Sequence, residues 1–210
     1  LTVPWTGYVP FEPARKEHPM TPTAKLIRCL TGLGLLMASS LVSAAAPAAA
    51  CPSTLNHTLL RLQDEKPQSL CQYAGKVVLA VNTASYCGFT KQYKGLEALH
   101  QKYQAEGLVV LGFPSNDFAQ EKGSNKEIAD FCESTFGVKF PMFAASSVRG
   151  EQANPFFRHL IAQGAPSPKW NFYKYLIGRD GNLVESYSSM TDPDSRSLTS
   201  AIEKSLKARP

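Results

Sequence analysis

The sequence predicts an α/β fold in which helices flank a central mixed β-sheet, with a small β-hairpin before it. Two continuous apolar runs, residues 77–81 and 108–113, are typical of strands buried on both faces, as in parallel sheets. A stretch with helical spacing separates these runs, so they can pair in parallel across a right-handed crossover. Near the C-terminus two further runs flank Asp180 and Gly181, a hairpin signal, which makes the sheet mixed.

The remaining elements follow from local patterns along the chain. A polar stretch between residues 57–62 and 69–72 predicts the N-terminal hairpin. Capping patterns at Ser124 and Asn154 predict the starts of two helices. Two more helices are predicted by apolar spacing: Leu96, Leu99, His100 and Tyr103 in one, and Leu198, Ile202 and Leu206 in the last. The resulting order, β-β-β-α-β-α-α-β-β-α, is that of a thioredoxin-like fold.

Composition narrows the class of protein. The chain has 210 residues, of which 43% are hydrophobic and 10% aromatic, so it is not a disordered chain. Its 22 Lys and Arg against 17 Asp and Glu give a net charge of +5, which is mild and spread along the sequence. A nucleic-acid binder should concentrate basic residues on one face, so we expect no nucleic-acid partner.

The N-terminal part differs from the rest. Lys25 and Arg28 precede an uncharged, partly apolar run that ends in alanines, which are the three parts of a secretory signal peptide over residues 20–50. A membrane-spanning helix is the alternative, but several serines dilute the run. Residues 1–19 resemble no targeting element and are interpreted as a non-native or mis-annotated upstream extension. We therefore expect a periplasmic or secreted protein whose single domain spans residues 51–210.

Four cysteines remain in this domain: Cys51, Cys71, Cys87 and Cys132. Export permits disulfides, and Cys51 and Cys71 bracket the predicted hairpin, so one hypothesis is a structural bridge between them. In another, the alanines before Cys51 form a weak lipoprotein box, so that the protein is lipid-anchored through Cys51 and Cys71 is free. The two could also be unrelated thiols.

Cys87 follows the first buried strand where the chain is expected to enter a helix. Unpaired backbone N–H groups and the positive end of a helix dipole favour thiolate over thiol at such a position, and the thiolate is the reactive form. The alternative is an inert core cysteine. No metal or cofactor is expected, because His57, His100 and His159 show no ligand spacing.

Three blocks of sequence carry a resemblance to a known family. Residues 82–90 match the pattern N-x-A-S-x-C-G-x-T, and residues 111–118 and 170–176 match a second and a third block in the same order. Together they resemble the glutathione peroxidase family, in its cysteine-containing, thioredoxin-dependent bacterial type. The resemblance covers about residues 53–207.

The resemblance implies a catalytic tetrad of Cys87, Gln120, Trp170 and Asn171. Gln120 is the least direct match, because the loop is one residue shorter than the family pattern F-G-x-Q-E-P-G and has Lys122 in place of proline. The indole and the two amides are neutral donors that would stabilise a thiolate and the charge on a departing oxygen.

The same resemblance assigns Cys132 as the resolving cysteine, which condenses with the sulfenic acid formed on Cys87. A disulfide needs Cα atoms within about 7 Å, so the helix that carries Cys132 would have to loosen. The alternative is that Cys132 is an inert residue on the apolar face of that helix, beside Ile128 and Phe131.

The sequence therefore predicts a thiol peroxidase that reduces hydrogen peroxide and organic or lipid hydroperoxides and is reset by a thioredoxin-like protein or glutathione. Longer members of the family carry an insertion before Trp170 that makes tetramer contacts and narrows the cleft. In this chain only the short segment 150–169 leads up to Trp170, so the resemblance implies a monomer with an open site. The alternative function is a peroxide sensor or relay that passes oxidation to a partner protein. A thiol–disulfide oxidoreductase is disfavoured, because Thr90 stands where its second active-site cysteine would be.

Overall fold

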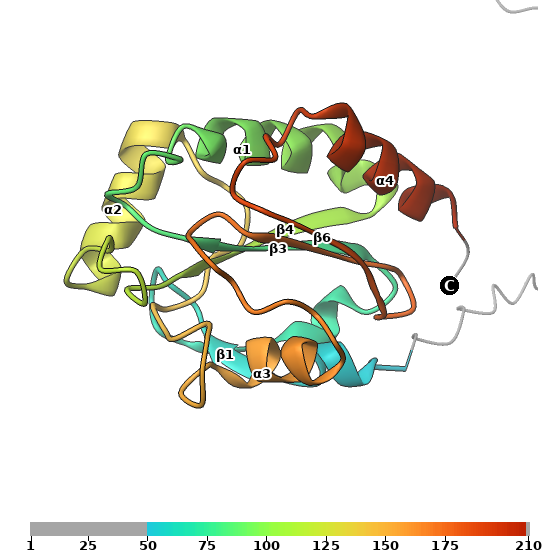
Figure 1. The fold of residues 1–210 in the computed structure, drawn as a ribbon, viewed down its shortest axis with the longest axis horizontal. Helices are drawn as coiled ribbons and strands as arrows, with labels where there is room; N and C mark the ends of the chain where they lie inside the picture. Colours follow the sequence, from blue (N-terminus) through green and yellow to red (C-terminus); the bar gives the residue numbers. More distant parts are fainter. Residues whose placement is uncertain (1–49, 209–210) are drawn as a thin grey trace, which may run out of the picture. The chain divides into compact units, whose positions relative to one another are not determined.

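The computed structural model describes residues 50–208. The predicted upstream extension and signal peptide lie outside the described residues, apart from Ala50. The central sheet has the strand order β4-β3-β5-β6, in which β3 (Val77–Thr83) is parallel to β4 (Leu108–Pro114) and antiparallel to β5 (Lys174–Ile177). β6 (Leu183–Tyr187) pairs antiparallel with β5 at the edge. The predicted mixed sheet and the predicted order of elements are both confirmed (Figure 1).

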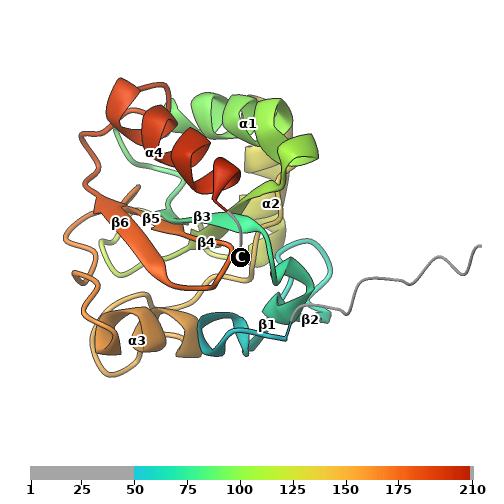
Figure 2. The ribbon, with the colours of Figure 1, turned by 90° about the vertical axis from the view of Figure 1, so that its right-hand side faces the viewer.

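Side chains of β3 alternate between two cores, one on each face of the sheet. Val77, Leu79 and Val81 pack under α1 (Gln92–Tyr103), α2 (Asn125–Phe136) and α4 (Arg196–Lys207). Val78 and Ala80 pack on the other face, which α3 (Pro155–Ala162) and the N-terminal hairpin cover (Figures 1 and 2). Both faces are apolar because both are covered, which is why the sequence of β3 reads as a continuous apolar run.

The N-terminal hairpin is shorter than the sequence predicts. β1 (Thr58–Leu60) pairs with β2 (Pro67–Ser69). The prediction of a second strand over residues 69–72 is wrong except at Ser69, where β2 ends. Leu70–Tyr73 forms a 3-10 helix, because the hydroxyl of Ser69 accepts the Cys71 N–H at 3.3 Å and a local bond of this kind competes with strand pairing. Two further 3-10 helices are Ser53–Leu55 and Gln104–Glu106.

A disulfide joins Cys51 to Cys71, with the Cα atoms 5.2 Å apart. The bridge between these residues is therefore present, and the sulfur of Cys51 is not free. By closing a loop over a sequence separation of 20, the bond restricts the unfolded chain, an effect of roughly 3 kcal/mol for loops of about this length.

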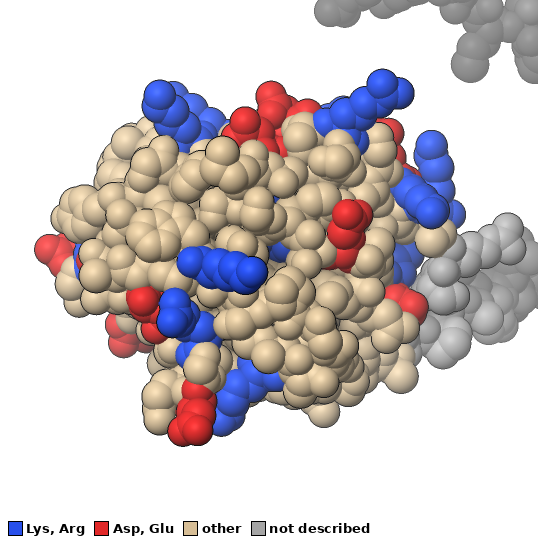
Figure 3. Space-filling model, in the orientation of Figure 1, with Lys and Arg blue, Asp and Glu red and all other residues tan. Residues whose placement is uncertain are grey.

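The surface carries charges of both signs. On the face shown in Figure 3, basic and acidic side chains are scattered among uncharged ones and form no basic stripe. Within residues 50–208 every helix is too short or too polar to cross a membrane.

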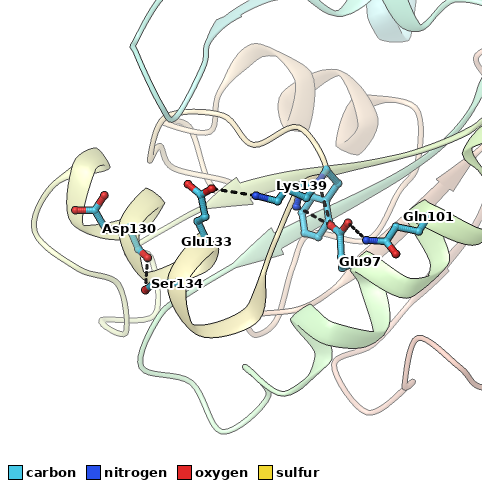
Figure 4. Close-up of polar contacts among 7 residues, drawn as sticks. Glu97, Gln101, Asp130, Glu133, Ser134 and Lys139 are labelled. Atoms are coloured by element: carbon cyan, nitrogen blue, oxygen red, sulfur yellow. Dashed lines mark hydrogen bonds and ion pairs between the residues drawn. The ribbon is translucent and has the colours of Figure 1, made fainter. Parts of the chain in front are cut away.

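A buried carboxylate anchors the chain after α2 to α1. Glu97 Oε2 accepts the backbone N–H groups of Lys139 at 2.7 Å and Phe140 at 3.1 Å, and its other oxygen accepts from Gln101 (Figure 4). Glu97 is 6% exposed. By contrast, Glu133 pairs with the Lys139 ammonium at the surface, where both side chains are mostly exposed. Glu97 thus binds the backbone of Lys139 inside the protein, whereas Glu133 binds the side chain of the same residue at the surface.

We expect Glu97→Ala to lower the free energy of unfolding by roughly 3 kcal/mol, because the buried Phe140 N–H and the part-buried Lys139 N–H both lose a carboxylate acceptor. Glu133→Ala should change it by less than about 0.5 kcal/mol, because an exposed ion pair contributes little. Urea unfolding of both variants measures the difference. Equal midpoints for the two variants would contradict the anchoring role of Glu97.

Candidate active site

The predicted site residues come from loops at one edge of the central sheet. β3 is followed by the loop that contains Cys87, and β4 by the loop that contains Gln120. Trp170 and Asn171 lie a few residues before β5. Because β3 is parallel to β4 and antiparallel to β5, these chain segments meet at the same edge.

Asn82 holds the segment that contains Trp170 and Asn171. Its amide Nδ2 donates to the Trp170 carbonyl at 3.1 Å, and its Oδ1 accepts the Tyr173 N–H at 3.0 Å. Its backbone carbonyl accepts the Phe172 N–H at 2.6 Å. Phe172 has φ +64, a left-handed conformation that costs a bulky side chain free energy and persists only where neighbours hold it. The fully buried Asn82 therefore fixes the turn on which two of the tetrad residues lie.

Gln120 and Asn171 are in direct contact. The Asn171 Nδ2 donates to Gln120 Oε1 at 2.9 Å, although 51 positions separate them in sequence. Ser189 Oγ donates to the Asn171 backbone carbonyl at 2.6 Å, and the Gln120 carbonyl accepts the Tyr86 N–H at 2.9 Å. The shortened loop thus still places Gln120 beside the Cys87 loop. It does so with Ala119 at φ +56, where the family pattern has glycine.

Cys87 is a free thiol and is 5% exposed. The chain makes a turn after it, closed by a Thr90 N–H bond to the Cys87 carbonyl at 3.1 Å, and α1 begins at Gln92. The helix therefore starts later than the sequence indicated. Within the described residues none of the three predicted donors bonds to the Cys87 sulfur. The structure brings Gln120 and Asn171 together, and the contact of either with Cys87 stays a prediction.

The donors needed for that contact are available. In the part of the chain that the structure describes, Gln120 Nε2 and Trp170 Nε1 donate to no protein acceptor, and the buried Oδ1 of Asn171 has no partner. The Trp170 ring packs on Phe118, with ring centres 5.3 Å apart, yet it is 41% exposed. The arrangement leaves an indole N–H and an amide free to meet a ligand from solvent.

Cys132 lies on α2 within the same core as Cys87. It is a free thiol, and burial raises its pKa to about 11. Cys132 is therefore protonated at neutral pH and shielded from solvent. Its resolving role stays a prediction, and its position in the core is also what the inert alternative expects.

Lys122, which replaces the proline of the family pattern, bridges the Cys87 loop and α2. Its ammonium donates to the Tyr86 hydroxyl at 2.9 Å and lies 4.5 Å from the centre of the Tyr86 ring. It also lies 5.2 Å from the centre of the Phe131 ring, next to Cys132 in sequence. Lys122 therefore links the loop that contains Cys87 to the helix that contains Cys132.

Lys174 is a fully buried amine at the base of the site, and sequence reasoning gave it no role. Its Nζ donates to the Phe172 carbonyl at 2.8 Å and so supports the same strained turn. Burial lowers the pKa of Lys174 to about 8, although the charge of Asp192 acts in the opposite direction. The one available signal was a lysine inside an apolar strand.

The pH dependence of stability tests this assignment. The unfolded chain binds the Lys174 proton up to about pH 10.5, whereas the folded state releases it near pH 8. Stability should therefore rise with pH through this window, by roughly 2 kcal/mol between about pH 7.5 and 10. The free energy of unfolding in urea is measured at both pH values for the wild type and for Lys174→Met. The difference between the two proteins isolates this contribution, because all other groups titrate alike in them. An equal rise in the two proteins would rule out Lys174 as its source.

Comparisons with known proteins show which family this chain resembles. A family model described as glutathione peroxidase matches residues 56–161. The glutathione peroxidase-like peroxiredoxin gpx1 of Schizosaccharomyces pombe is 49% identical over 137 residues, which cover 63% of this chain and 87% of that protein. The hydroperoxy fatty acid reductase gpx1 of Synechocystis sp. is 45% identical over 154 residues, which cover 68% and 90%.

A solved structure, described as Trgpx in apo form, is 34% identical, with a TM-score of 0.60. It covers 74% of this chain and 97% of its own. The family match, the curated relatives and the three sequence blocks point to one conclusion. The chain belongs to the glutathione peroxidase family.

Proposed function

We propose that this protein reduces hydroperoxides with Cys87 as the nucleophile and Gln120, Trp170 and Asn171 as the stabilising donors. The observation that carries the proposal is the Asn171–Gln120 hydrogen bond of 2.9 Å. It forms at the sheet edge where β3 ends and the loop with Cys87 begins. Family membership supplies the peroxidase activity.

In the first step, the Cys87 thiolate attacks one peroxide oxygen. An S–O bond forms, the O–O bond breaks, and the electron pair leaves with the second oxygen, which takes a proton to become water or an alcohol. Cys87 is left as a sulfenic acid. The donors are uncharged, so they stabilise both the thiolate and the departing oxygen without adding a competing negative charge.

In the second step, Cys132 condenses with the sulfenic acid, and a dithiol reductant then reduces the Cys87–Cys132 disulfide. Relatives named peroxiredoxins support a protein dithiol such as a thioredoxin-like partner, with glutathione as the alternative. The missing insertion before Trp170 supports action as a monomer.

Hydroperoxides with long acyl chains are included in the proposed substrates. Trp170 and Tyr86 are exposed near the site, and Met190 is 77% exposed beside Ser189, which bonds to Asn171. Apolar side chains at an open site favour contact with a hydrocarbon chain. A relative named as a hydroperoxy fatty acid reductase supports the same substrate class.

The proposed location is outside the cytoplasm. The signal-peptide pattern over residues 20–50 motivates this proposal, and the Cys51–Cys71 disulfide supports it, because such bonds persist in oxidising compartments. A disulfide-bonded Cys51 has no thiol to acylate, so an exported soluble form is favoured over the lipid-anchored one.

The second candidate function is a peroxide sensor or relay, which shares the first chemical step. Exposed aromatic side chains beside the nucleophile also suit a protein partner. Steady peroxide turnover with a dithiol reductant supports the enzyme, whereas one stoichiometric mixed disulfide with a partner supports the relay.

Stopped-flow oxidation by hydrogen peroxide tests the assignment of the two cysteines. Cys87→Ser should abolish the fast phase, because Cys132, the other free thiol of the described residues, is buried and protonated at neutral pH. Cys132→Ser should keep the fast phase and stall after one turnover, because no disulfide forms. Fast oxidation of Cys87→Ser would overturn the nucleophile, and sustained thioredoxin-driven cycling of Cys132→Ser would remove the resolving role.

A further inference from the structure

Arg149, in the loop between α2 and α3, places a positive charge beside the aromatic side chains of the site. Its Cζ lies 5.2 Å from the centre of the Phe118 ring, and the centre of that ring lies 5.3 Å from the centre of the Trp170 ring. Because both distances are measured to the same ring, Arg149 Cζ is no further from the indole than their sum. Three side chains in contact thus connect an exposed arginine to a residue of the tetrad.

A carboxylate fixes the loop that carries Arg149. Asp117 accepts the Val148 N–H at 2.7 Å and the Ser147 hydroxyl at 2.9 Å, and both donors directly precede Arg149 in the chain. Hydrogen bonds to an ionised carboxylate are stronger than those between neutral groups. Asp117 is also the residue before Phe118, so one side chain holds the arginine loop against the segment that carries the ring.

Among the described residues the guanidinium of Arg149 has no acidic partner. Asp117, and Glu151 two positions further along the loop, form no ion pair with it, because the described ion pairs all involve other side chains. The contact that Arg149 does make is with the face of an aromatic ring, which leaves the edge of the guanidinium free to donate. A planar guanidinium binds a carboxylate through two parallel N–H bonds. Arg149 is therefore suited to receive a carboxylate from solvent.

We propose that Arg149 binds the carboxylate of a fatty acid whose mid-chain hydroperoxide is reduced at Cys87. Free fatty acid hydroperoxides are then preferred over their neutral esters. This inference rests on the proposed peroxidase function and names its substrate class. C–C bonds of about 1.5 Å at angles of about 111° advance a chain by about 10 Å in eight bonds. That length is close to the greatest separation that the Phe118 contacts allow between Arg149 and Trp170.

This span explains which peroxides gain from Arg149. With the carboxylate on the arginine, a hydroperoxide near the middle of an acyl chain reaches Trp170, and the carbons between them lie along the half-buried Phe118 ring. Hydrogen peroxide and esters react at the same sulfur but have no anionic group for Arg149.

Two lysines are the other candidate cations close to the site in sequence. The Lys122 ammonium is already bonded to the Tyr86 hydroxyl at 2.9 Å. Lys169 directly precedes Trp170 and is exposed, but among the described residues its ammonium lies over no aromatic ring. Arg149 is the cation that the described contacts join to the tetrad, and Lys169 is the alternative that the experiment includes.

Stopped-flow oxidation of the reduced full chain tests the proposal. The mid-chain hydroperoxide of linoleic acid, its methyl ester and hydrogen peroxide are compared below micelle-forming concentrations. Arg149→Met should lower the second-order rate constant for the acid by about tenfold, as for loss of one exposed charge-assisted contact. The rate constants for the ester and for hydrogen peroxide should stay within about twofold of the wild type, because neither carries a charge for the arginine to bind.

Two further variants separate charge from packing. Arg149→Lys keeps the charge and should recover part of the loss for the acid, but not all of it, because the paired geometry is gone. Arg196→Met removes an exposed arginine on α4 and is the matched control, which should equal the wild type for all three peroxides. The wild-type preference for the acid over the ester should also shrink as ionic strength rises, because salt screens exposed charges.

The outcomes distinguish this inference from the function on which it rests. The role of Arg149 alone is overturned if the wild type oxidises equally fast with acid and ester, or if Arg149→Met loses equally with all three peroxides. A selective loss with the acid in Lys169→Met and not in Arg149→Met would overturn it as well. A wild type that no hydroperoxide oxidises would overturn the proposed peroxidase function and this inference together.

Discussion

The site depends on the way buried Asn82 holds the chain in front of β5. Its side chain and its backbone carbonyl bond to Trp170, Phe172 and Tyr173, so the end of β3 and the turn that carries the tetrad form one hydrogen-bonded unit. The side-chain amide of Asn82 makes its bonds without adding a charge of its own to the core, where an unpaired charge is costly. The sheet supplies the rest, because its mixed strand directions bring three distant loops to one edge.

Around this unit the chemistry is divided between neutral and ionisable groups. Gln120, Trp170 and Asn171 are uncharged, so they can stabilise sulfur and oxygen anions at any physiological pH. Glu121 and Lys174 are ionisable. Burial raises the pKa of Glu121 and lowers the pKa of Lys174, so it favours the uncharged form of both. Both groups bond to the backbone, Lys174 to the Phe172 carbonyl and Glu121 to the Ser85 N–H, and so support the loops of the site.

Much of this could be predicted from sequence, for identifiable reasons. The apolar run of β3 predicts a strand buried on both faces, and the cap at Ser124 predicts the start of α2, because both signals are local. Cys87 is predicted as reactive by its position after the first strand. Gln120, Trp170 and Asn171 are predicted by resemblance alone, since none of them taken singly has a distinctive pattern. The strand predicted over residues 69–72 failed because one hydroxyl favoured a 3-10 turn.

The sequence could not predict the contacts that support the site, although Asn82 and Glu121 lie within the matched motifs. Asn82 and Lys174 bond to backbone N–H and C=O groups. Nearly every residue has such groups, so no sequence pattern shows which residues the two side chains will contact. Glu121 and Lys122 also act through contacts with other segments. Glu121 accepts the Ser85 N–H, and Lys122 contacts Tyr86 in the Cys87 loop and Phe131 on α2. These contacts exist only once the sheet has brought the loops together.

The central claim is that Gln120 and Asn171 act as one donor unit on the Cys87 sulfur. A double-mutant cycle on the second-order rate constant of Cys87 oxidation, with Gln120→Ala, Asn171→Ala and the double variant, tests it most directly. Each single change should slow oxidation by about 100-fold, as for loss of one preorganised donor. The double variant should be little slower than either, because the two amides are bonded to each other. Wild-type rates in the single variants, or fully multiplicative losses, would contradict the account.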